Sequence, residues 1–423
     1  MSQDKPSLAS LVQAGEAQSE ATPINDFIFG AQDISNLYLL RTDDGDLLVN
    51  TGFMDNAPRN KALIDACRSG PLRHIVLTQA HPDHYGGVPA LRESGTQVIA
   101  QRQFADTWRF FNELGPYLGR RSRKLWGGTI KRPAKAAPPP EVVPDVLVSD
   151  KLAFEQGGRR FEALSTPGGE SPCSLVLWLP DERVLFTGNL FGPVFEAVPN
   201  LVTIRGDKPR SVDAYLRSLE CVRALDAELL ITGHGEPVRG ADTIRRSLDK
   251  MHAAVSYLRE AVIAGMNAGH SVYALMRDIR LPDELQLGEQ HGKVAWAVRS
   301  IWEGYSGWFH YDTTTALYDV SPRAVDQDIA ALAGGTEALA RRAQEHLDAD
   351  APLPAMHLLD IALGADPACP LSLATRKEAL QRLLDASGGR NLSETMWLRA
   401  EIASAEDALE HNKNLAAASG EMQ

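Results

Sequence analysis

The residues best suited to chemistry lie in the run from Thr78 to Gly87, TQAHPDHYGG. Two histidines and an aspartate, His81, Asp83 and His84, fall within four residues of the chain. The run follows the apolar stretch 74–77, which is short and branched enough to be a buried strand. A loop at the end of a strand can direct imidazole and carboxylate groups at one point, and zinc accepts such mixed nitrogen and oxygen ligands. The run therefore predicts a metal site.

The spacing resembles the His-x-His-x-Asp-His signature of the metallo-β-lactamase superfamily, except that Gln79 stands where the first histidine is expected. Three later positions extend the resemblance. Gly169, followed by Glu170, occupies the place of the histidine that commonly follows Thr-Pro-Gly. Asn189 stands where a bridging aspartate is usual, and His234, within Gly-His-Gly, matches the last ligand position.

These departures resemble one branch of the superfamily, the alkylsulfatases. In that branch a glutamate replaces the third histidine, as Glu170 does here. The segment 200–206, NLVTIRG, is similar to one with which the branch presents an asparagine and an arginine to sulfate. The resemblance implies that Asn200 and Arg205 bind the substrate, and the alternative role of Arg205 is a surface ion pair.

The C-terminal part of the chain agrees with this resemblance. Residues 302–309 resemble the Tyr-x-Gly-Trp element of the alkylsulfatases, and we assign Tyr305 to the substrate, although packing is the alternative role. Residues 332–335 and the helices that follow resemble the dimerisation domain of that group. The resemblance covers roughly residues 36–401, and we expect the lipid-carrier-like domain of the long members to be missing.

The resemblance also implies a ligand set for zinc. One ion would take Gln79, His81 and Glu170, and the other would take Asp83, His84 and His234. An amide cannot bridge two ions as a carboxylate does, so Asn189 and Gln79 should both weaken the second ion. We expect one or two zinc ions. We also expect Asp83 and Arg205 to be the catalytic residues.

Three functions are compatible with these residues. The first is a metallo-hydrolase in which a zinc-activated water attacks a sulfate ester or a related small organic anion. The second is a hydrolase of a carboxylic ester, a lactone or a β-lactam that uses the same loops. The third is a pseudo-hydrolase that binds a ligand without turnover, which the residues Gln79, Gly188 and Asn189 together favour.

The elements that must position these residues predict an α/β fold, an αββα metallo-β-lactamase sandwich followed by an all-helical C-terminal domain. Expected strands lie at 36–41, 47–50, 74–77, 97–100, 152–154, 161–165, 174–179, 184–187 and 229–232. We expect a flexible N-terminus (1–22), the sandwich (23–245), a helical extension that contributes to the pocket (246–320), the dimerisation domain (321–411) and a flexible tail (412–423). The segment 119–140 is basic and then proline-rich, and favours a solvated loop over a lid.

Composition limits the partners. The net charge of −12 argues against nucleic acid and anionic membranes, and the sequence offers neither a signal peptide nor an apolar stretch long enough to span a bilayer. The four scattered cysteines suggest no disulfide framework, so a cytoplasmic location is expected. Leu358, Leu359, Ile361 and Leu363 exceed what one helix face can bury in a lone chain. We therefore expect a homodimer.

Overall fold

The computed structural model describes residues 7–132, 137–208 and 210–420. The chain divides into two compact units, Met1–Arg123 with Gly127–Tyr305 and Lys124–Trp126 with Ser306–Gln423.

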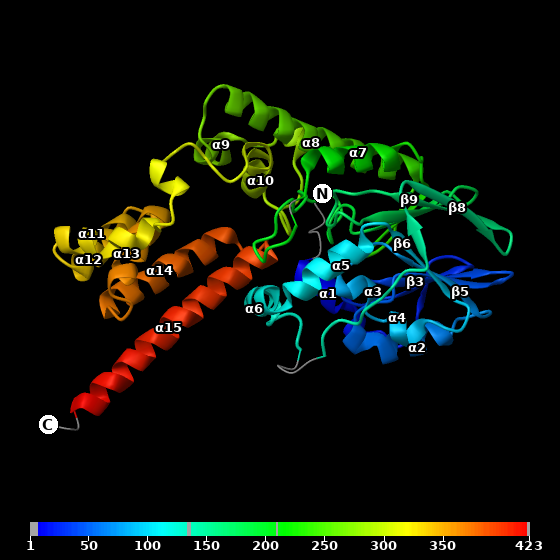
Figure 1. Ribbon diagram of the computed structural model, residues 1–423, viewed down its shortest axis with the longest axis horizontal. Coiled ribbons are helices and arrows are strands. Elements are labelled where there is room, and N and C mark those ends of the chain that lie inside the picture. The colour runs from blue at the N-terminus through cyan, green and yellow to red at the C-terminus, as the bar shows by residue number, and fades with distance from the viewer. Residues whose placement is uncertain (1–6, 133–136, 209, 421–423) are drawn as a thin grey trace. The chain divides into compact units, whose positions relative to one another are not determined.

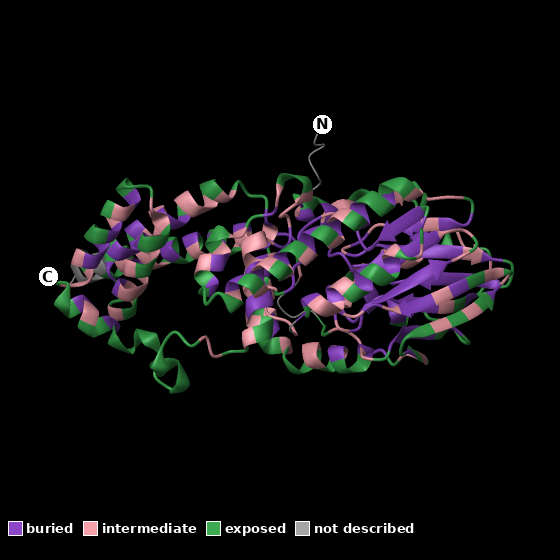
Figure 2. Cartoon of the chain, turned by 90° about the horizontal axis from the view of Figure 1, so that it is seen from above, coloured by how far each residue is buried: buried purple, intermediate pink, exposed green. Residues whose placement is uncertain are grey.

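Two mixed sheets form the centre of the first unit, and most of their strands are buried (Figures 1 and 2). The first sheet has the strand order β1 (Thr22–Pro23), β2 (Ile28–Ala31), β3 (Leu37–Thr42), β4 (Gly45–Val49), β5 (Leu72–Leu77), β6 (Gln97–Gln101) and β7 (Val146–Val148). The second has the order β13 (Val238–Arg239), β12 (Leu229–Thr232), β11 (Val184–Gly188), β10 (Leu175–Leu179), β9 (Arg159–Ser165) and β8 (Lys151–Gln156). Strands β4 to β7 are parallel, as are β11 and β12.

Alternating side chains explain why the two sheets stack. Leu40 of β3 and Val76 of β5 pack against side chains of the second sheet such as Leu177. Their neighbours Leu39 and Ile75 belong to a different cluster, which includes side chains of the helices on the other face. Because successive side chains of a strand point to opposite faces, strands that are apolar throughout must be covered on both sides. The expected αββα sandwich is confirmed.

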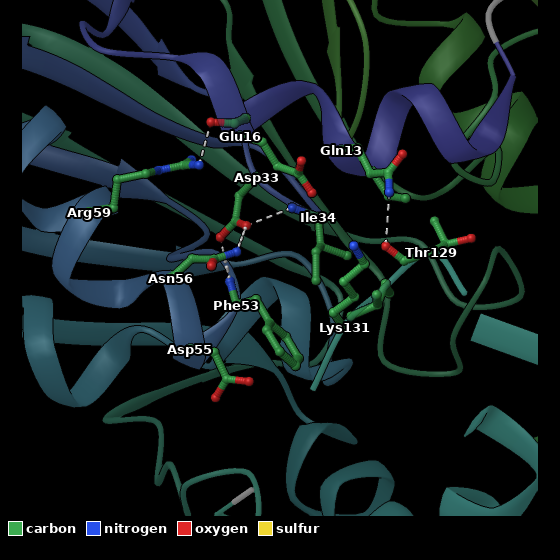
Figure 3. Close-up of a pocket in the computed structure, with 13 residues that line it drawn as sticks. Gln13, Glu16, Asp33, Ile34, Phe53, Asp55, Asn56, Arg59, Thr129 and Lys131 are labelled. Atoms are coloured by element: carbon green, nitrogen blue, oxygen red, sulfur yellow. Dashed lines mark hydrogen bonds between the residues drawn. The ribbon is translucent and has the colours of Figure 1, made fainter. Parts of the chain in front are cut away.

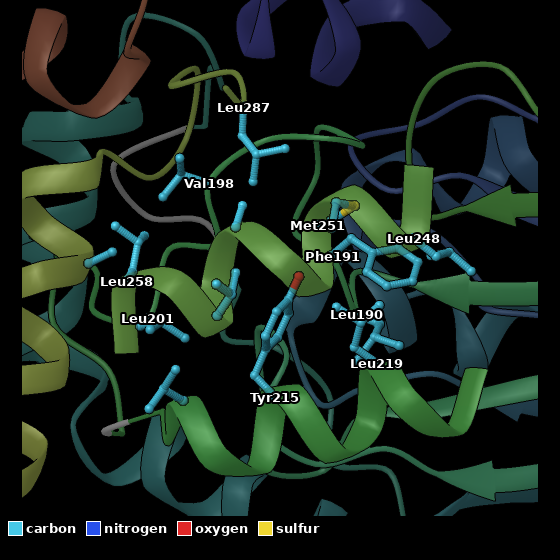
Figure 4. Close-up of a cluster of buried hydrophobic side chains, with 14 of the residues drawn as sticks. Leu190, Phe191, Val198, Leu201, Tyr215, Leu219, Leu248, Met251, Leu258 and Leu287 are labelled. Atoms are coloured by element: carbon cyan, nitrogen blue, oxygen red, sulfur yellow. The ribbon is translucent and has the colours of Figure 1, made fainter. Parts of the chain in front are cut away.

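The helices of the first unit cover the outer faces of the two sheets. They are α1 (Leu8–Gln13), η1 (Ala14–Ala17), η2 (Met54–Asn56), α2 (Ala57–Asp65), α3 (Pro82–Tyr85), α4 (Val88–Leu91), α5 (Phe104–Glu113), α6 (Gly115–Trp126), α7 (Val212–Arg223), α8 (Ala241–Asn267), α9 (Val272–Asp278), η3 (Asp283–Leu285) and α10 (Val294–Ser306). Helices α7 and α8 lie against the second sheet, where Tyr215, Leu219 and Met251 join one large apolar cluster (Figure 4). Val198 and Leu201 belong to the same cluster, so the loop that carries Asn200 is anchored in the core.

The second unit is helical. It contains η4 (Thr314–Leu317), η5 (Pro322–Val325), α11 (Asp326–Leu332), α12 (Thr336–Asp348), α13 (Pro352–Ala365), α14 (Pro370–Ser387) and α15 (Leu392–Gly420). Helices α12, α13 and α14 share a small apolar core that includes Ala343, Leu359 and Ala379. The expected helical C-terminal region is confirmed. Leu359 is fully buried and Leu358 and Ile361 are partly buried within this unit, so this group of apolar residues is not the exposed surplus that we expected.

Several segment boundaries differ from the sequence interpretation. Within the expected flexible N-terminus, residues 8–17 are helical and Leu8 and Val12 are buried, while residues 1–6 lie outside the described residues. The boundary drawn at 245/246 falls inside α8, and the two units divide after Tyr305 rather than near residue 321. The tail from 412 continues α15 to Gly420, and residues 421–423 are not among those described.

The segment 119–140 is not a loop throughout, because residues up to Trp126 belong to α6. Leu118 supplies the buried side of this helix, and the basic residues around it occupy more exposed positions. Residues 133–136 lie outside the described part, so whether that stretch is a lid or a loop stays a prediction.

No helix of the described chain is long and apolar enough to cross a membrane.

Candidate metal centre

The predicted ligands come together where loops follow the strand ends. His81, Asp83 and His84 follow β5, Glu170 follows β9, Asn189 follows β11 and His234 follows β12. Ligand atoms of Asp83, His84 and His234 all lie within 4.8 Å of one another. This group combines one carboxylate with two imidazoles, which is a donor set that zinc accepts.

The tautomer of His84 is fixed by its hydrogen bonds. Asn50 Oδ1 accepts from both the backbone N–H and the hydroxyl of Thr78, each at 3.0 Å. Since the Thr78 hydroxyl has donated its proton, it can only accept from His84 Nδ1, which lies 3.0 Å away. His84 therefore carries its proton on Nδ1, and its Nε2 lone pair is available to a metal ion.

Gln79 contacts both neighbouring imidazoles through one atom. Its side-chain nitrogen lies 3.0 Å from His84 Nε2 and 2.7 Å from His81 Nδ1. Because His84 Nε2 is an acceptor, the Gln79 atom facing it must be the NH₂ donor, and the second proton of that group points to His81. In this arrangement the amide of Gln79 donates to two lone pairs that a metal ion would otherwise use.

Asn189 makes the corresponding contacts on the other side. Its side-chain nitrogen lies 2.9 Å from Glu170 Oε2 and 3.1 Å from His234 Nε2. His291 Nε2 donates to the other oxygen of Glu170 at 2.7 Å. Asn189 therefore faces the site, and it offers a donor where the resemblance has an anionic bridge.

Burial sets the charge of these groups. Burial lowers the pKa of His84 to about 3 and that of His234 to about 4. Both imidazoles are neutral at pH 7 and keep their lone pairs. Burial raises the pKa of Asp83, whereas Glu170 is held well below its ordinary pKa because the His291 hydrogen bond and the Arg210 charge outweigh its burial.

Polar atoms without partners point to a ligand in this place. Among the described residues, Gln79 Oε1, His81 Nε2, Asn189 Oδ1 and His234 Nδ1 are buried and make no hydrogen bond. Buried polar atoms normally have partners, so such a concentration suits a site that takes an ion or a substrate. The donor set and these atoms fit at least one metal ion, held by Asp83, His84 and His234.

A group of charged residues lies beside His81. Asp207 Oδ2 is 2.9 Å from Arg210 Nη2 and 3.5 Å from both Arg205 Nη2 and His81 Nε2. Burial alone would raise the pKa of Asp207, but the contact with His81 and the charges of the two arginines lower it well below its usual range. Asp207 is therefore ionised, and it joins the predicted metal ligands to the predicted anion-binding arginine.

Helix α6 supports the loop that carries Arg205. Arg121 donates to the backbone carbonyls of Ile204 and Arg205, the first at 2.7 Å. Arg210 donates to the carbonyl of Asn200 at 2.6 Å, and the Asn200 side chain lies 3.3 Å from His291 Nε2. Arg121 thus holds this loop at Ile204 and Arg205, and the Arg210–Asn200 hydrogen bond ties its start to its end.

Comparisons with known proteins match two parts of the chain to two families. Residues 30–234 match the Metallo-beta-lactamase superfamily, and residues 274–409 match the Alkyl sulfatase dimerisation family. The chain combines these two domains. The second match begins before the boundary that we expected at 321.

The relatives and solved structures point the same way. This chain is 29% identical over 325 residues to the "Linear primary-alkylsulfatase" of Pseudomonas sp., covering 71% of this chain and 61% of that protein. It is 23% identical to the "Alkyl/aryl-sulfatase BDS1" of Saccharomyces cerevisiae, covering 74% and 52%. The solved structure of the "stereoselective inverting sec-alkylsulfatase Pisa1" from Pseudomonas sp. shares its fold, with a TM-score of 0.80 at 22% identity, covering 93% of this chain and 65% of that one. This chain spans less than two thirds of the length of each.

Most of the predicted site residues meet in the metallo-beta-lactamase domain, but Tyr305 does not join them. Its hydroxyl lies 3.2 Å from Asp213 of α7, and its side chain is exposed. The sequence interpretation assigned no role to Asp207, Arg210 or His291. The charged residues at 205, 207 and 210 are close together in the sequence and could have indicated a functional group. Their contacts, however, depend on the path of the loop, which the sequence does not show.

A cavity of about 330 Å³ is lined in part by Asp33 and Ile34 (Figure 3). The next residue, Ser35, lies 3.4 Å from His84 Nδ1. Asp33 accepts hydrogen bonds from two backbone N–H groups and from Asn56 and Asn60. Burial raises the pKa of Asp33 despite these bonds. Asp33 is thus held in place by four donors, and we assign it no part in a reaction.

The depressed pKa of His234 predicts a pH-dependent stability in the metal-free protein. Below its ordinary pKa of 6.5 this histidine is protonated in the unfolded chain, but in the folded protein only near pH 4. The free energy of unfolding should therefore fall as pH falls from 6.5 to 4, with this residue contributing about 1.4 kcal/mol per pH unit at most. Chemical denaturation at several pH values should show that the free energy of unfolding of His234→Gln depends less steeply on pH than that of the wild type. The exposed His357→Gln serves as the control, and equal slopes in wild type and His234→Gln would contradict the assignment.

Proposed function

We propose that this chain is a metal-dependent hydrolase of sulfate monoesters. The observation that carries the proposal is the position of Asp207, one oxygen of which lies within 3.5 Å of both His81 and Arg205. The candidate metal centre and the predicted anion-binding arginine are therefore neighbours. The names of the relatives support the same reaction class, although this chain covers only 61% of the first of them.

The residues divide the work by their chemistry. Asp83, His84 and His234 hold a zinc ion, and His81, Glu170 and Gln79 are available to a second. Bound zinc supplies a water molecule of lowered pKa and a positive charge beside the substrate. Arg205 binds the sulfate through its Nε, which is buried and makes no hydrogen bond within the described structure. Asn200 contributes its side-chain oxygen or nitrogen to orient the substrate.

The local charge favours a substrate with one negative charge. Arg205 and Arg210 carry two positive charges, and Asp207 neutralises one of them. A sulfate monoester is a monoanion, whereas a phosphate monoester near pH 7 carries close to two charges. Esters, lactones and other neutral substrates would leave Arg205 without a counter-charge in a partly buried place. The sulfate ester therefore suits this group better than the neutral esters and lactones of the second class.

The pseudo-hydrolase is supported by one specific observation. The side-chain amides of Gln79 and Asn189 donate to His81, His84, His234 and Glu170, which occupies one lone pair of each of these ligands without a metal ion. Metal content of the purified protein separates this alternative from the hydrolase. A homodimer and a cytoplasmic location also remain part of the proposal.

Activity on a substrate panel tests the reaction class. The zinc-loaded protein should hydrolyse alkyl sulfates faster than lactones or β-lactams. Arg205→Ala should lower kcat/KM for an alkyl sulfate roughly 100-fold, since it removes a charged donor from the transition state. Arg223→Ala, which breaks a surface pair with Asp249, is the matched control. Faster turnover of a lactone or a β-lactam, unaffected by Arg205→Ala, would favour the second class instead.

Metal stoichiometry tests the two amide positions. Asn189→Asp replaces a donor by an anionic ligand, so the bound metal should rise towards two ions per chain. Asp83→Ala should lose more metal than Gln79→Ala, because a carboxylate is the stronger ligand. Asn267→Asp, at an exposed position of α8, controls for the added charge. Unchanged metal content in Asn189→Asp would remove Asn189 from the site, and a wild-type protein without metal would leave the pseudo-hydrolase.

Light scattering tests the homodimer. The match to the dimerisation family and the exposed side chains of Trp308, Tyr311 and Tyr318 support a contact between two copies. At micromolar concentration the mass should be twice the 46.1 kDa of one chain. The triple replacement of these aromatic residues by serine should shift the mass towards one chain, whereas Tyr257→Ser in α8 should not. A wild-type mass of one chain would exclude the dimer.

A further inference from the structure

His81 is the predicted ligand whose orientation has two independent constraints. On one side its Nδ1 accepts from the amide of Gln79 at 2.7 Å. On the other side its Nε2 faces the carboxylate of Asp207 at 3.5 Å. A neutral imidazole has one N–H and one lone pair, so an acceptor at Nδ1 requires the proton to be on Nε2.

Asp207 is well placed to receive that proton as a hydrogen bond. Its side chain is 3% exposed, and its own position is fixed because its Oδ1 accepts from the backbone N–H of Lys208 at 2.7 Å. Arg210, whose side chain is 2% exposed, holds Oδ2 at 2.9 Å. His81 Nε2 makes no hydrogen bond elsewhere in the described chain. The 3.5 Å separation is slightly longer than a good hydrogen bond, and such contacts commonly shorten when a site is loaded.

We propose that Asp207 is a positioning residue that holds His81 with its proton on Nε2 and its Nδ1 directed at the metal centre. A carboxylate that receives the N–H of a metal-bound histidine fixes the ring and makes the opposite nitrogen a better ligand. This deepens the proposed function, on which its metal-binding part rests. Asp207 also contacts Arg205, so the same carboxylate sets the distance between the anion-binding group and the ligand.

The first test uses the metal-free protein and therefore does not depend on the proposed reaction. NMR should show an imidazole N–H proton in slow exchange with water, assigned to His81 by its loss in His81→Gln. In Asp207→Ala this signal should broaden through faster exchange. The control is Asp46→Asn, which alters another buried aspartate, held by Ser69 and Gly70 at the opposite end of β4. A His81 signal on Nδ1, or a signal unchanged in Asp207→Ala, would overturn the proposal.

The second test follows zinc binding. Titrations with a competing chelator identify the binding step that His81→Gln weakens. Asp207→Asn should weaken that same step about 10- to 100-fold, and should weaken it little further when His81 is already replaced. An equal loss in both backgrounds would overturn the proposal, because Asp207 would then act on the fold and not through His81. Tighter binding of inorganic sulfate with unchanged zinc affinity would also overturn it, since Asp207 would only balance the charge of Arg205. A wild-type protein that binds no zinc defeats the hydrolase, while the NMR signal still decides the role of Asp207.

Discussion

The hydrogen-bond chain that begins at Asn50 constrains the rest of the site. Asn50 has a positive φ of 60°, a conformation that asparagine tolerates better than most residues, and its Oδ1 accepts twice from Thr78. Each later group then has only one possible direction of donation, through His84 and Gln79 to His81. Gly188 must remain without a side chain, because a Cβ there would collide with Thr78. The tautomer of His84 is thus decided by Asn50 and Thr78, which are not predicted ligands, and that of His81 by its neighbour Gln79.

Burial gives these directions their energetic weight. A misdirected donor in water finds another partner, whereas a buried one leaves an unsatisfied group that costs about 1–3 kcal/mol. His84 is fully buried and His234 nearly so, and their neutral state follows from the same burial. The ligands are therefore prepared for a cation before any cation binds, and the amides of Gln79 and Asn189 compete with it for the same lone pairs.

The sequence predicted the sandwich well because its strands are apolar and bounded by turns. The strands β3 to β6 and β8 to β12 lie where apolar runs were found, whereas β2 (Ile28–Ala31), β7 (Val146–Val148) and the two-residue strands β1 and β13 were missed. Short strands carry too few residues for a periodic signal. Helix α6 was missed because its many basic residues made the segment resemble a solvated loop, although one side of the helix is buried. The predicted ligands met because local motifs place them, but Asp207, Arg210 and His291 act through contacts between distant loops, which no local pattern encodes. For Tyr305, whose hydroxyl lies against Asp213, the assignment to the substrate stays a prediction, because a motif alone does not place a side chain.

The negative charge that is missing at position 189 has a counterpart at Asp207, on the other side of His81. Asn189 removes a negative charge where the superfamily pattern has an aspartate, next to His234 and Glu170. Asp207 provides a negative charge on the far side of His81, next to two arginines. A carboxylate between two ions strengthens the binding of both. A carboxylate that accepts a hydrogen bond from a histidine ligand strengthens the binding by that histidine only. Here the carboxylate also reduces the attraction of Arg205 for an anion. The described site therefore has few anionic ligands, each with a fixed orientation. The substrate preference that we propose depends on how much positive charge Asp207 leaves on Arg205.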